Sequence, residues 1–162
     1  MNPKVFLCHA SEDKDRFVLE FAKKLRQKGI DVWLDIWEMY PGDSIVDKIF
    51  NEGIKNANAF IIVISKNSVE KAWVKEELNA AVIKRIEKKC KLIPVVIDQC
   101  EIPICLKSLV WEKIGDLKNY DSNLDRIVYS IFEIIKKPEI GKEPKYVNLV
   151  IDNVPNLSKI DS

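Results

Sequence analysis

The sequence predicts an α/β protein with a flavodoxin-like, doubly wound sheet of about five parallel strands in the order 2-1-3-4-5, flanked by helices. Short apolar runs alternate with stretches whose apolar residues recur at helical spacing, which is typical of βαβ units. Residues 59–65, Ala-Phe-Ile-Ile-Val-Ile-Ser, form the longest strand-like run. Because a parallel strand is buried on both faces, such a run indicates the centre of the sheet.

Each expected strand is a short apolar segment with polar residues at its ends. We expect strands at 4–8, 30–35, 59–65 and 92–97, and a short fifth strand near 110–111. Pro94 cannot donate a ladder hydrogen bond, so its strand is expected near the edge of the sheet.

The expected helices follow the strands in turn. Ser11 opens the first helix, with acidic residues near its positive end, and Gly29 ends it in a left-handed cap. A loop with Pro41 and Gly42 fills 36–43, and helical spacing resumes at 44–50, at 74–82 and at 122–137. Ser122 and Asp125 are expected to cap the last helix, and Pro138 to stop it.

The character of the chain changes at Pro138. The stretch at 138–145 has the composition of an extended linker, and 146–151 is expected to be a short strand. We therefore divide the chain into a domain at 1–137 and, at 138–162, a linker with the start of a further segment. We expect the sequence to be the N-terminal part of a larger protein.

Composition excludes several classes of protein. The 162 residues carry 26 Lys and Arg against 25 Asp and Glu, a net charge of +1, so no nucleic-acid partner is predicted. No apolar run approaches the roughly 20 residues of a membrane-spanning helix, so no membrane contact is predicted. The first residues also lack the features of a signal peptide, and a cytoplasmic location is the expectation.

The four cysteines do not predict a metal site. Cys8, Cys90, Cys100 and Cys105 include no C-x-x-C pair, and His9 is the only histidine. We expect half-buried thiols in a reducing compartment, with no metal bound.

Ligands of an open parallel sheet bind beyond the carboxyl ends of its strands, here at the loops 9–13 and 65–72, with 36–43 beside them. No G-x-G-x-x-G and no G-x-x-x-x-G-K-[ST] is present, so no backbone cradle for phosphates is predicted. The absence of a G-x-S-x-G motif removes the common hydrolase interpretation as well.

Trp73 and Glu77 are four residues apart, which places both on one face of the expected helix. Glu76 points about 100° away from that face. Leu78 and Val82 occupy the buried face, so the pair can line a cleft while the helix packs. On spacing alone, however, a half-buried Trp and a solvated Glu are the commoner arrangement.

Four segments, in order, resemble the boxes of TIR (Toll/interleukin-1 receptor) domains. They are 4–13, 29–35 with 41–43 after it, 60–65 followed by 73–78, and 92–96. The resemblance extends over about 4–136 and is greatest to prokaryotic, NAD-cleaving members.

This resemblance implies the roles of individual residues. Glu77 falls on the catalytic glutamate of the enzymatic members. The implied substrate-binding positions are Trp73, His9, Ala10, Asp35, Tyr40 and Ser65. Some relatives have an arginine where this chain has His9 and Ala10, which leaves the phosphate contact open; Lys14 and Arg16 are alternatives.

The implied activity is that of an NAD+ nucleosidase that works in immune defence signalling and is activated by assembly. It releases nicotinamide and forms ADP-ribose or a cyclic ADP-ribose isomer, with NAD+ as substrate and no cofactor. Because nicotinamide leaves NAD+ as a neutral molecule, one carboxylate that stabilises the oxocarbenium ion suffices.

The alternative is a non-catalytic module that signals through TIR–TIR contacts. The loop residues Trp37, Tyr40, Pro41 and Gly42 place large apolar groups in an exposed turn, which suits self-association.

Overall fold

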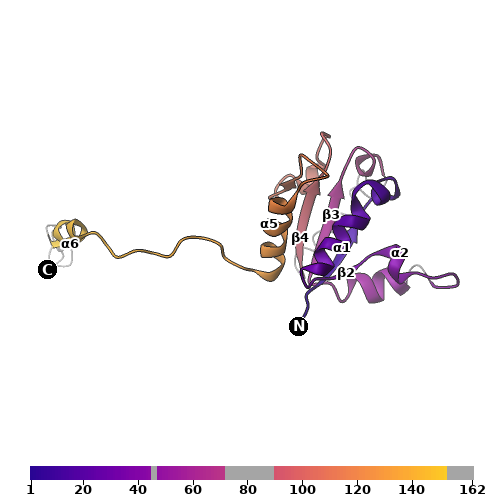
Figure 1. Ribbon diagram of the computed structural model, residues 1–162, viewed down its shortest axis with the longest axis horizontal. Coiled ribbons are helices and arrows are strands. Elements are labelled where there is room, and N and C mark those ends of the chain that lie inside the picture. The colour runs from indigo at the N-terminus through magenta and orange to yellow at the C-terminus, as the bar shows by residue number, and fades with distance from the viewer. Residues whose placement is uncertain (45–46, 72–89, 153–162) are drawn as a thin grey trace, which may run out of the picture.

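The structure, a computed structural model, describes residues 1–44, 47–71 and 90–152. It contains one parallel sheet of five strands in the order β2-β1-β3-β4-β5, which confirms the predicted fold class and order (Figure 1). In chain order the elements are β1 (Lys4–Cys8), η1 (Ser11–Asp13), η2 (Lys14–Val18), α1 (Leu19–Gln27), β2 (Asp31–Trp33), α2 (Asp35–Glu38), η3 (Asp47–Ile54), β3 (Ala59–Ile64), η4 (Ser68–Glu70), β4 (Lys91–Val96), η5 (Ile104–Leu106), β5 (Glu112–Lys113), α5 (Asp121–Phe132) and α6 (Lys145–Asp152).

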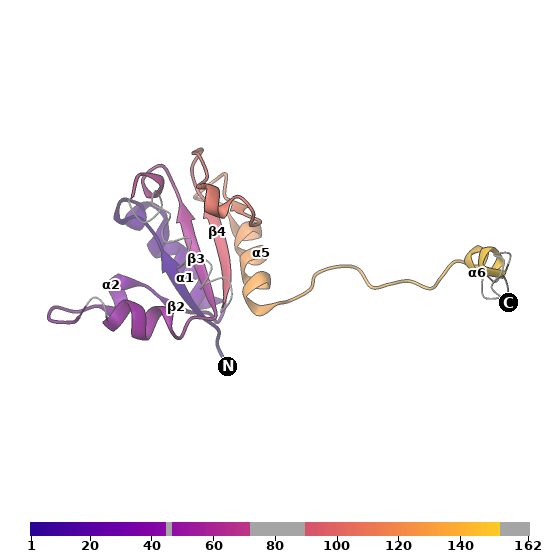
Figure 2. The ribbon, with the colours of Figure 1, turned by 180° about the vertical axis from the view of Figure 1, so that it is seen from behind.

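Each face of the sheet is covered by its own cluster of buried apolar side chains. On one face Val5 and Ile61 belong to a cluster with Phe21 of α1 and Ile127 of α5. On the other face Phe6 lies in a second cluster, which includes η5 and is flanked by the end of η3. Every residue of β3 is buried, as its apolar run predicted. Figure 2 shows β3 between β1 and β4 from the opposite side.

Pro94 fits its strand because of its position in the ladder. The backbone N–H groups of Lys91 and Ile97 donate toward β3. Successive residues of a strand direct their N–H groups to alternate sides, so Pro94 turns its nitrogen toward β5. β5 pairs only with Val95 and Val96. The missing donor therefore falls where β4 has no partner strand, next to the edge of the sheet.

Helix α5 begins and ends at different residues from those predicted. The predicted capping box at Ser122 and Asp125 is wrong, because the helix begins at Asp121 and its N-cap is Tyr120, two residues before Ser122, with no side-chain cap. The side-chain amide of Asn123 donates to the Glu112 carboxylate at 2.8 Å and so joins the first turn to β5. This is a tertiary contact at the start of the helix, and it does not satisfy the backbone N–H groups that a cap would satisfy.

The predicted stop of this helix at Pro138 is also wrong. The helix ends at Phe132, and Glu133 adopts a left-handed conformation with φ 57°. Lys91, at the amino end of β4, donates from Nζ to Ser130 O at 2.9 Å. The helix has therefore reached the end of the sheet, and Ile135, beyond it, is 76% exposed rather than part of the apolar stripe.

Residues 146–151 are helical, so the predicted strand there is wrong. They belong to α6, which stands apart from the sheet at the end of an exposed segment in both views (Figures 1 and 2). A strand needs a neighbour to pair its backbone, whereas a helix pairs its backbone internally. No helix in the described parts of the chain is long and apolar enough to span a membrane.

The predicted loop at 36–43 is partly helical. α2 occupies its first half, and a turn follows in which Asp43 N donates to Tyr40 O at 3.0 Å. Gly42 has φ 94°, the value that the third position of a type II turn requires after Pro41. The strand expected near 110–111 is found two residues later, as β5.

Candidate functional site

The carboxyl ends of β1, β3 and β4 bring three loops together around the carboxylate of Asp13. This side chain is 0% exposed. It accepts hydrogen bonds from Arg16 Nε at 3.0 Å, from Asn67 Nδ2 at 2.8 Å and from the hydroxyl of Ser65. A buried carboxylate is costly unless it is paired, and three donors here satisfy it.

Arg16 joins this carboxylate to a second one. Its Nη1 and Nη2 donate to the two oxygens of Asp98 at 3.1 and 2.5 Å, a bidentate pair. Burial would raise the pKa of Asp98, but the bonds from Arg16 and from Lys66 N outweigh it, and this pKa lies below its usual value. Arg16 is thus held between two carboxylates, which leaves it unsuited to the phosphate contact considered above.

The chain after β3 turns tightly at Ser65, whose residue is 0% exposed. Ser65 N donates to Ser68 Oγ at 2.8 Å, and Ser68 N donates back to Ser65 Oγ at 3.0 Å. Lys66 N donates to Asp98, and Lys71 Nζ lies 2.6 Å from Glu12 Oε1. The structure therefore places the predicted substrate residue Ser65 inside the turn that anchors this loop.

His9 and Asp35, two predicted substrate residues from the ends of β1 and β2, lie beside each other. His9 Nε2 is 3.8 Å from Asp35 Oδ1, and Lys14 Nζ is 3.6 Å from the other oxygen. The side chain of His9 is 5% exposed, while that of Asp35 is 45% exposed. Burial lowers the pKa of His9 below its usual value, and the nearby Asp35 only partly opposes this. The imidazole is therefore neutral at pH 7.

The remaining predicted residues are distributed differently. Ala10 is buried, whereas Tyr40 is 69% exposed on its turn. Trp37 was expected beside Tyr40 in an exposed loop, but it lies in α2 and packs partly against the core. The predicted catalytic Glu77 and its partner Trp73 lie outside the described residues.

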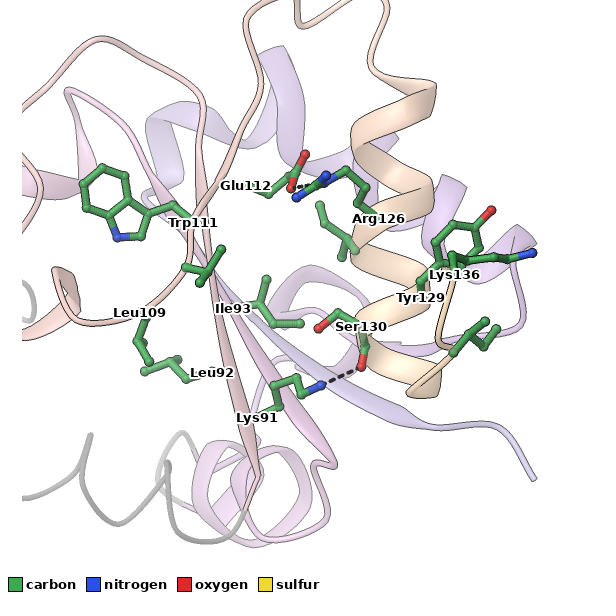
Figure 3. A pocket seen from close by; sticks show the side chains of 13 residues that line it. Lys91, Leu92, Ile93, Leu109, Trp111, Glu112, Arg126, Tyr129, Ser130 and Lys136 are labelled. Atoms are coloured by element: carbon green, nitrogen blue, oxygen red, sulfur yellow. Dashed lines mark hydrogen bonds and ion pairs between the residues drawn. The ribbon is translucent and has the colours of Figure 1, made fainter. Parts of the chain in front are cut away.

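A pocket of about 460 Å³ lies away from these residues, between β4, β5 and α5 (Figure 3). Arg126 pairs with Glu112 at its rim, with 3.0 Å between Nε and Oε2, and Lys91 reaches Ser130 O. None of the predicted site residues that the structure describes lines it, and its carboxylate, Glu112, is already held by Arg126 and Asn123. The chemistry is expected instead at the strand ends.

Metal ligands do not gather in the part of the chain that the structure describes: no group of three or more His, Cys, Asp or Glu is placed to hold an ion. None of the four cysteines forms a disulfide bond, and each is of intermediate exposure. Burial raises the pKa of Cys8 to about 12 and that of Cys90 to about 11, so both stay protonated at neutral pH.

Asp13 and Asn67 lie in the predicted ligand loops 9–13 and 65–72 but were not singled out as site residues, and Asp98 was not predicted. A usable signal was present, because Asp98 directly follows the apolar run of β4, as the loop of Asp13 follows β1. Arg16 and Asp98 lie 82 positions apart, and no local pattern contains such a pairing.

Comparison with known proteins gives a consistent result. Residues 5–128 match the family model described as the TIR domain. The NAD+ hydrolase TcpA of Theionarchaea archaeon is 33% identical over 138 residues, which cover 84% of this chain and 41% of that protein. The 2′ cyclic ADP-D-ribose synthase BtTIR of Bacteroides thetaiotaomicron is 41% identical over 90 residues, which cover 56% of this chain and 31% of that protein.

A solved structure supports the fold. The TIR domain of the Toll-related receptor TRR-2 from Hydra magnipapillata superposes with a TM-score of 0.61 at 22% identity, over 78% of this chain and 94% of that one. The chain spans less than half the length of either enzyme named above.

Proposed function

Because the chain belongs to the TIR domain family, we propose that it is an NAD+ nucleosidase that breaks the bond between nicotinamide and ribose. The observation that carries the proposal is the similarity to relatives named for NAD+ cleavage and for cyclic ADP-ribose synthesis. The matched region, 5–128, includes both Trp73 and Glu77. We further propose a cytoplasmic enzyme of immune signalling, with the TIR domain at 1–137 and a linker segment at 138–162.

One carboxylate is enough for this reaction. The nicotinamide ring of NAD+ is cationic and leaves as a neutral molecule, so no general acid is needed. In our proposal Glu77 stabilises the oxocarbenium ion that develops on the ribose, an effect that is largest in a site with little water. Trp73 supplies a face on which a ring can stack.

The described strand ends support a role in binding the rest of the substrate. Asp35 is half exposed and can accept hydrogen bonds from ribose hydroxyls, while the neutral imidazole of His9 adds no charge. Lys14 is the cation that we propose for the diphosphate, because its ion pair with Asp35 is 3.6 Å long, whereas Arg16 is held by two carboxylates. NAD+ is the substrate in this proposal, and no cofactor is needed.

The decisive test is nicotinamide release from NAD+ by the wild type and by Glu77→Gln. Loss of a group that stabilises the transition-state charge typically lowers kcat about 10²–10³-fold, and we expect a loss of that size. Glu76→Gln is the matched control, because the neighbouring carboxylate is predicted to point away, and it should retain wild-type kcat. Equal release by Glu77→Gln and the wild type contradicts the proposal.

The product profile distinguishes hydrolysis from cyclisation. Water as acceptor gives ADP-ribose, whereas the adenine of the same molecule gives a cyclic isomer. Chromatography of NAD+ incubated with the protein resolves the two, and either product is consistent with cleavage by Glu77.

The second candidate function is a non-catalytic TIR–TIR interaction module. Tyr40 favours it, because a 69% exposed aromatic side chain on a glycine turn suits self-association. Tyr40→Ser is expected to reduce association in sedimentation experiments. If it also abolishes signalling while Glu77→Gln preserves signalling, the interaction module is correct. If both variants abolish signalling, assembly and catalysis act together.

A further inference from the structure

Two acidic groups and one guanidinium form a continuous cluster at the carboxyl edge of the sheet. Arg16 uses Nε on Asp13 and both terminal nitrogens on Asp98. Asp13 follows β1, whereas Asp98 follows β4. The planar fork of an arginine suits such a double pairing, which a lysine ammonium cannot reproduce.

The loop after β3 donates into both carboxylates of this cluster. Ser65 and Asn67 donate to Asp13, and the backbone N–H of Lys66 donates to Asp98. Three consecutive residues are therefore held by two carboxylates that Arg16 keeps together. The far end of the same loop is joined to the loop after β1 by the ion pair between Lys71 and Glu12.

We propose that Arg16 is a positioning residue: with Asp13 and Asp98 it holds the loop 65–71 in the conformation that NAD+ cleavage requires. This inference rests on the proposed function, because Trp73 and Glu77 follow that loop within six residues of Lys71. A group placed wrongly by about 1 Å can lose about 10²-fold in rate without touching the substrate itself.

The cluster acts on loops and not on the packing of the sheet. The strands pack through the two apolar clusters, which consist of hydrophobic side chains. The cluster holds loops instead of strands, and the Arg16 side chain remains 36% exposed. Loss of Arg16 is therefore expected to loosen the loops while the sheet stays folded.

The kinetic test uses Arg16→Gln and Arg16→Lys in the full chain, with nicotinamide release as the readout. We expect Arg16→Gln to lower kcat by about 10-fold or more while KM changes less than about 3-fold, because positioning acts on the transition state more than on binding. Arg16→Lys keeps the positive charge but lacks the planar guanidinium, so its kcat should lie between that of the wild type and that of Arg16→Gln. A rise in KM with unchanged kcat would overturn the proposal, since it would make Arg16 a substrate contact.

Arg26→Gln is the matched control. Arg26 also pairs with a carboxylate at 3.0 Å, that of Asp31, but both side chains are about half exposed and the pair joins α1 to the start of β2. This control should match the wild type in kcat and in melting temperature. A loss of kcat in Arg16→Gln that only parallels a lower melting temperature would assign Arg16 to stability and overturn the proposal.

Amide hydrogen exchange tests the positioning without reference to activity. In Arg16→Gln and Asp98→Asn, the amides of Lys66 and Ser68 should exchange at least about 10-fold faster, while those of β3 stay unchanged. Unchanged exchange at both amides overturns the proposal. If the wild type releases no nicotinamide, the proposed function fails, and faster exchange in the variants still supports the positioning of the loop.

Discussion

His9 is the only histidine of the chain, and its surroundings set how stability depends on pH near neutrality. Burial lowers its pKa in the folded state, with Asp35 partly opposing and Lys14 adding to the shift. The unfolded chain, with a pKa near 6.5 at this position, therefore binds a proton that the folded chain resists. The contribution of His9 to the free energy of unfolding is fully present above about pH 6.5, and it is lost as the pH decreases toward the pKa of the folded state.

We therefore expect the melting temperature of the wild type to fall between pH 7.5 and 5.5, and the fall to be smaller in His9→Gln. Asp35→Asn removes the group that opposes the shift, so its decline should be steeper than that of the wild type. Thermal unfolding across this pH range checks both variants. Identical slopes for the wild type and His9→Gln would show that the folded state does not disfavour the imidazolium.

Tyr120 buries a hydroxyl that has no hydrogen-bond partner among the described residues. The Tyr120 ring is well packed: its centroid lies 5.4 Å from the centroid of the Phe17 ring. Lys24 Nζ lies over the Tyr120 ring, 4.2 Å from the centroid. Burial also raises the pKa of its hydroxyl to about 12, so it stays neutral in any ordinary buffer.

Tyr120→Phe removes this hydroxyl and keeps the ring, so we expect the free energy of unfolding to stay equal or rise by up to about 1 kcal/mol. Tyr120→Ala should instead cost about 3–5 kcal/mol through the cavity that it leaves. Urea unfolding measures both values. A loss of more than about 1 kcal/mol in Tyr120→Phe would mean that the hydroxyl has a partner in solution.

At the scale of an element, helix propensity and side-chain packing favour different residues at one position of η3, Gly53. Gly53 is a poor helix former, yet a Cβ there would lie 2.5 Å from Cε2 of Phe6. The Phe6 ring cannot easily move, because it stacks on Trp33 with 4.7 Å between centroids and contacts Phe60. Close approach of the helix to β1 therefore requires glycine.

Gly53→Ala is expected to destabilise the protein. Helix propensity would favour alanine by about 1 kcal/mol, but overpacking against Phe6 costs about 1–3 kcal/mol and outweighs it. Gly115→Ala is the control, since a Cβ there meets nothing within 4 Å. Chemical denaturation should show a loss only for Gly53→Ala, and a gain in stability would mean that η3 moves away from the sheet at little cost.

The ends of elements were harder to predict than the elements themselves. The apolar stripe of α5 correctly indicated a helix through Leu124, Ile127 and Val128. Its first turn is joined to β5 by the Asn123–Glu112 hydrogen bond, and its last turn lies beside Lys91 at the amino end of β4. Both are tertiary distances, and a periodic pattern carries no information on them.

At the scale of the whole molecule, the sheet domain and α6 are separated by an extended, exposed segment (Figure 1). In both views α6 lies apart from the sheet, and a boundary between folding units commonly falls in such an exposed linker. The proposed division at Pro138 rests on this separation.

A chain that ends at residue 137 should therefore melt within about 2 °C of the full chain, because little buried surface is lost. Calorimetry of both forms checks this expectation. A clearly lower melting temperature in the shorter form would show that α6 or the linker packs on the sheet in solution, and the proposed boundary would have to move.

By itself the sequence predicted the parallel fold and the order of the strands, through the alternation of strand and helix patterns along the chain. It also predicted the left-handed Gly29 and the turn at Gly42, which depend on a few neighbouring residues. It also indicated which edge of the sheet carries the strand-end loops. Tertiary structure alone decided that Arg16 pairs with Asp13 and Asp98 and that Ser65 is enclosed. Local periodicity extends over a helical turn, whereas these partners lie up to 82 positions apart and meet only because the sheet places β1 and β4 on either side of β3.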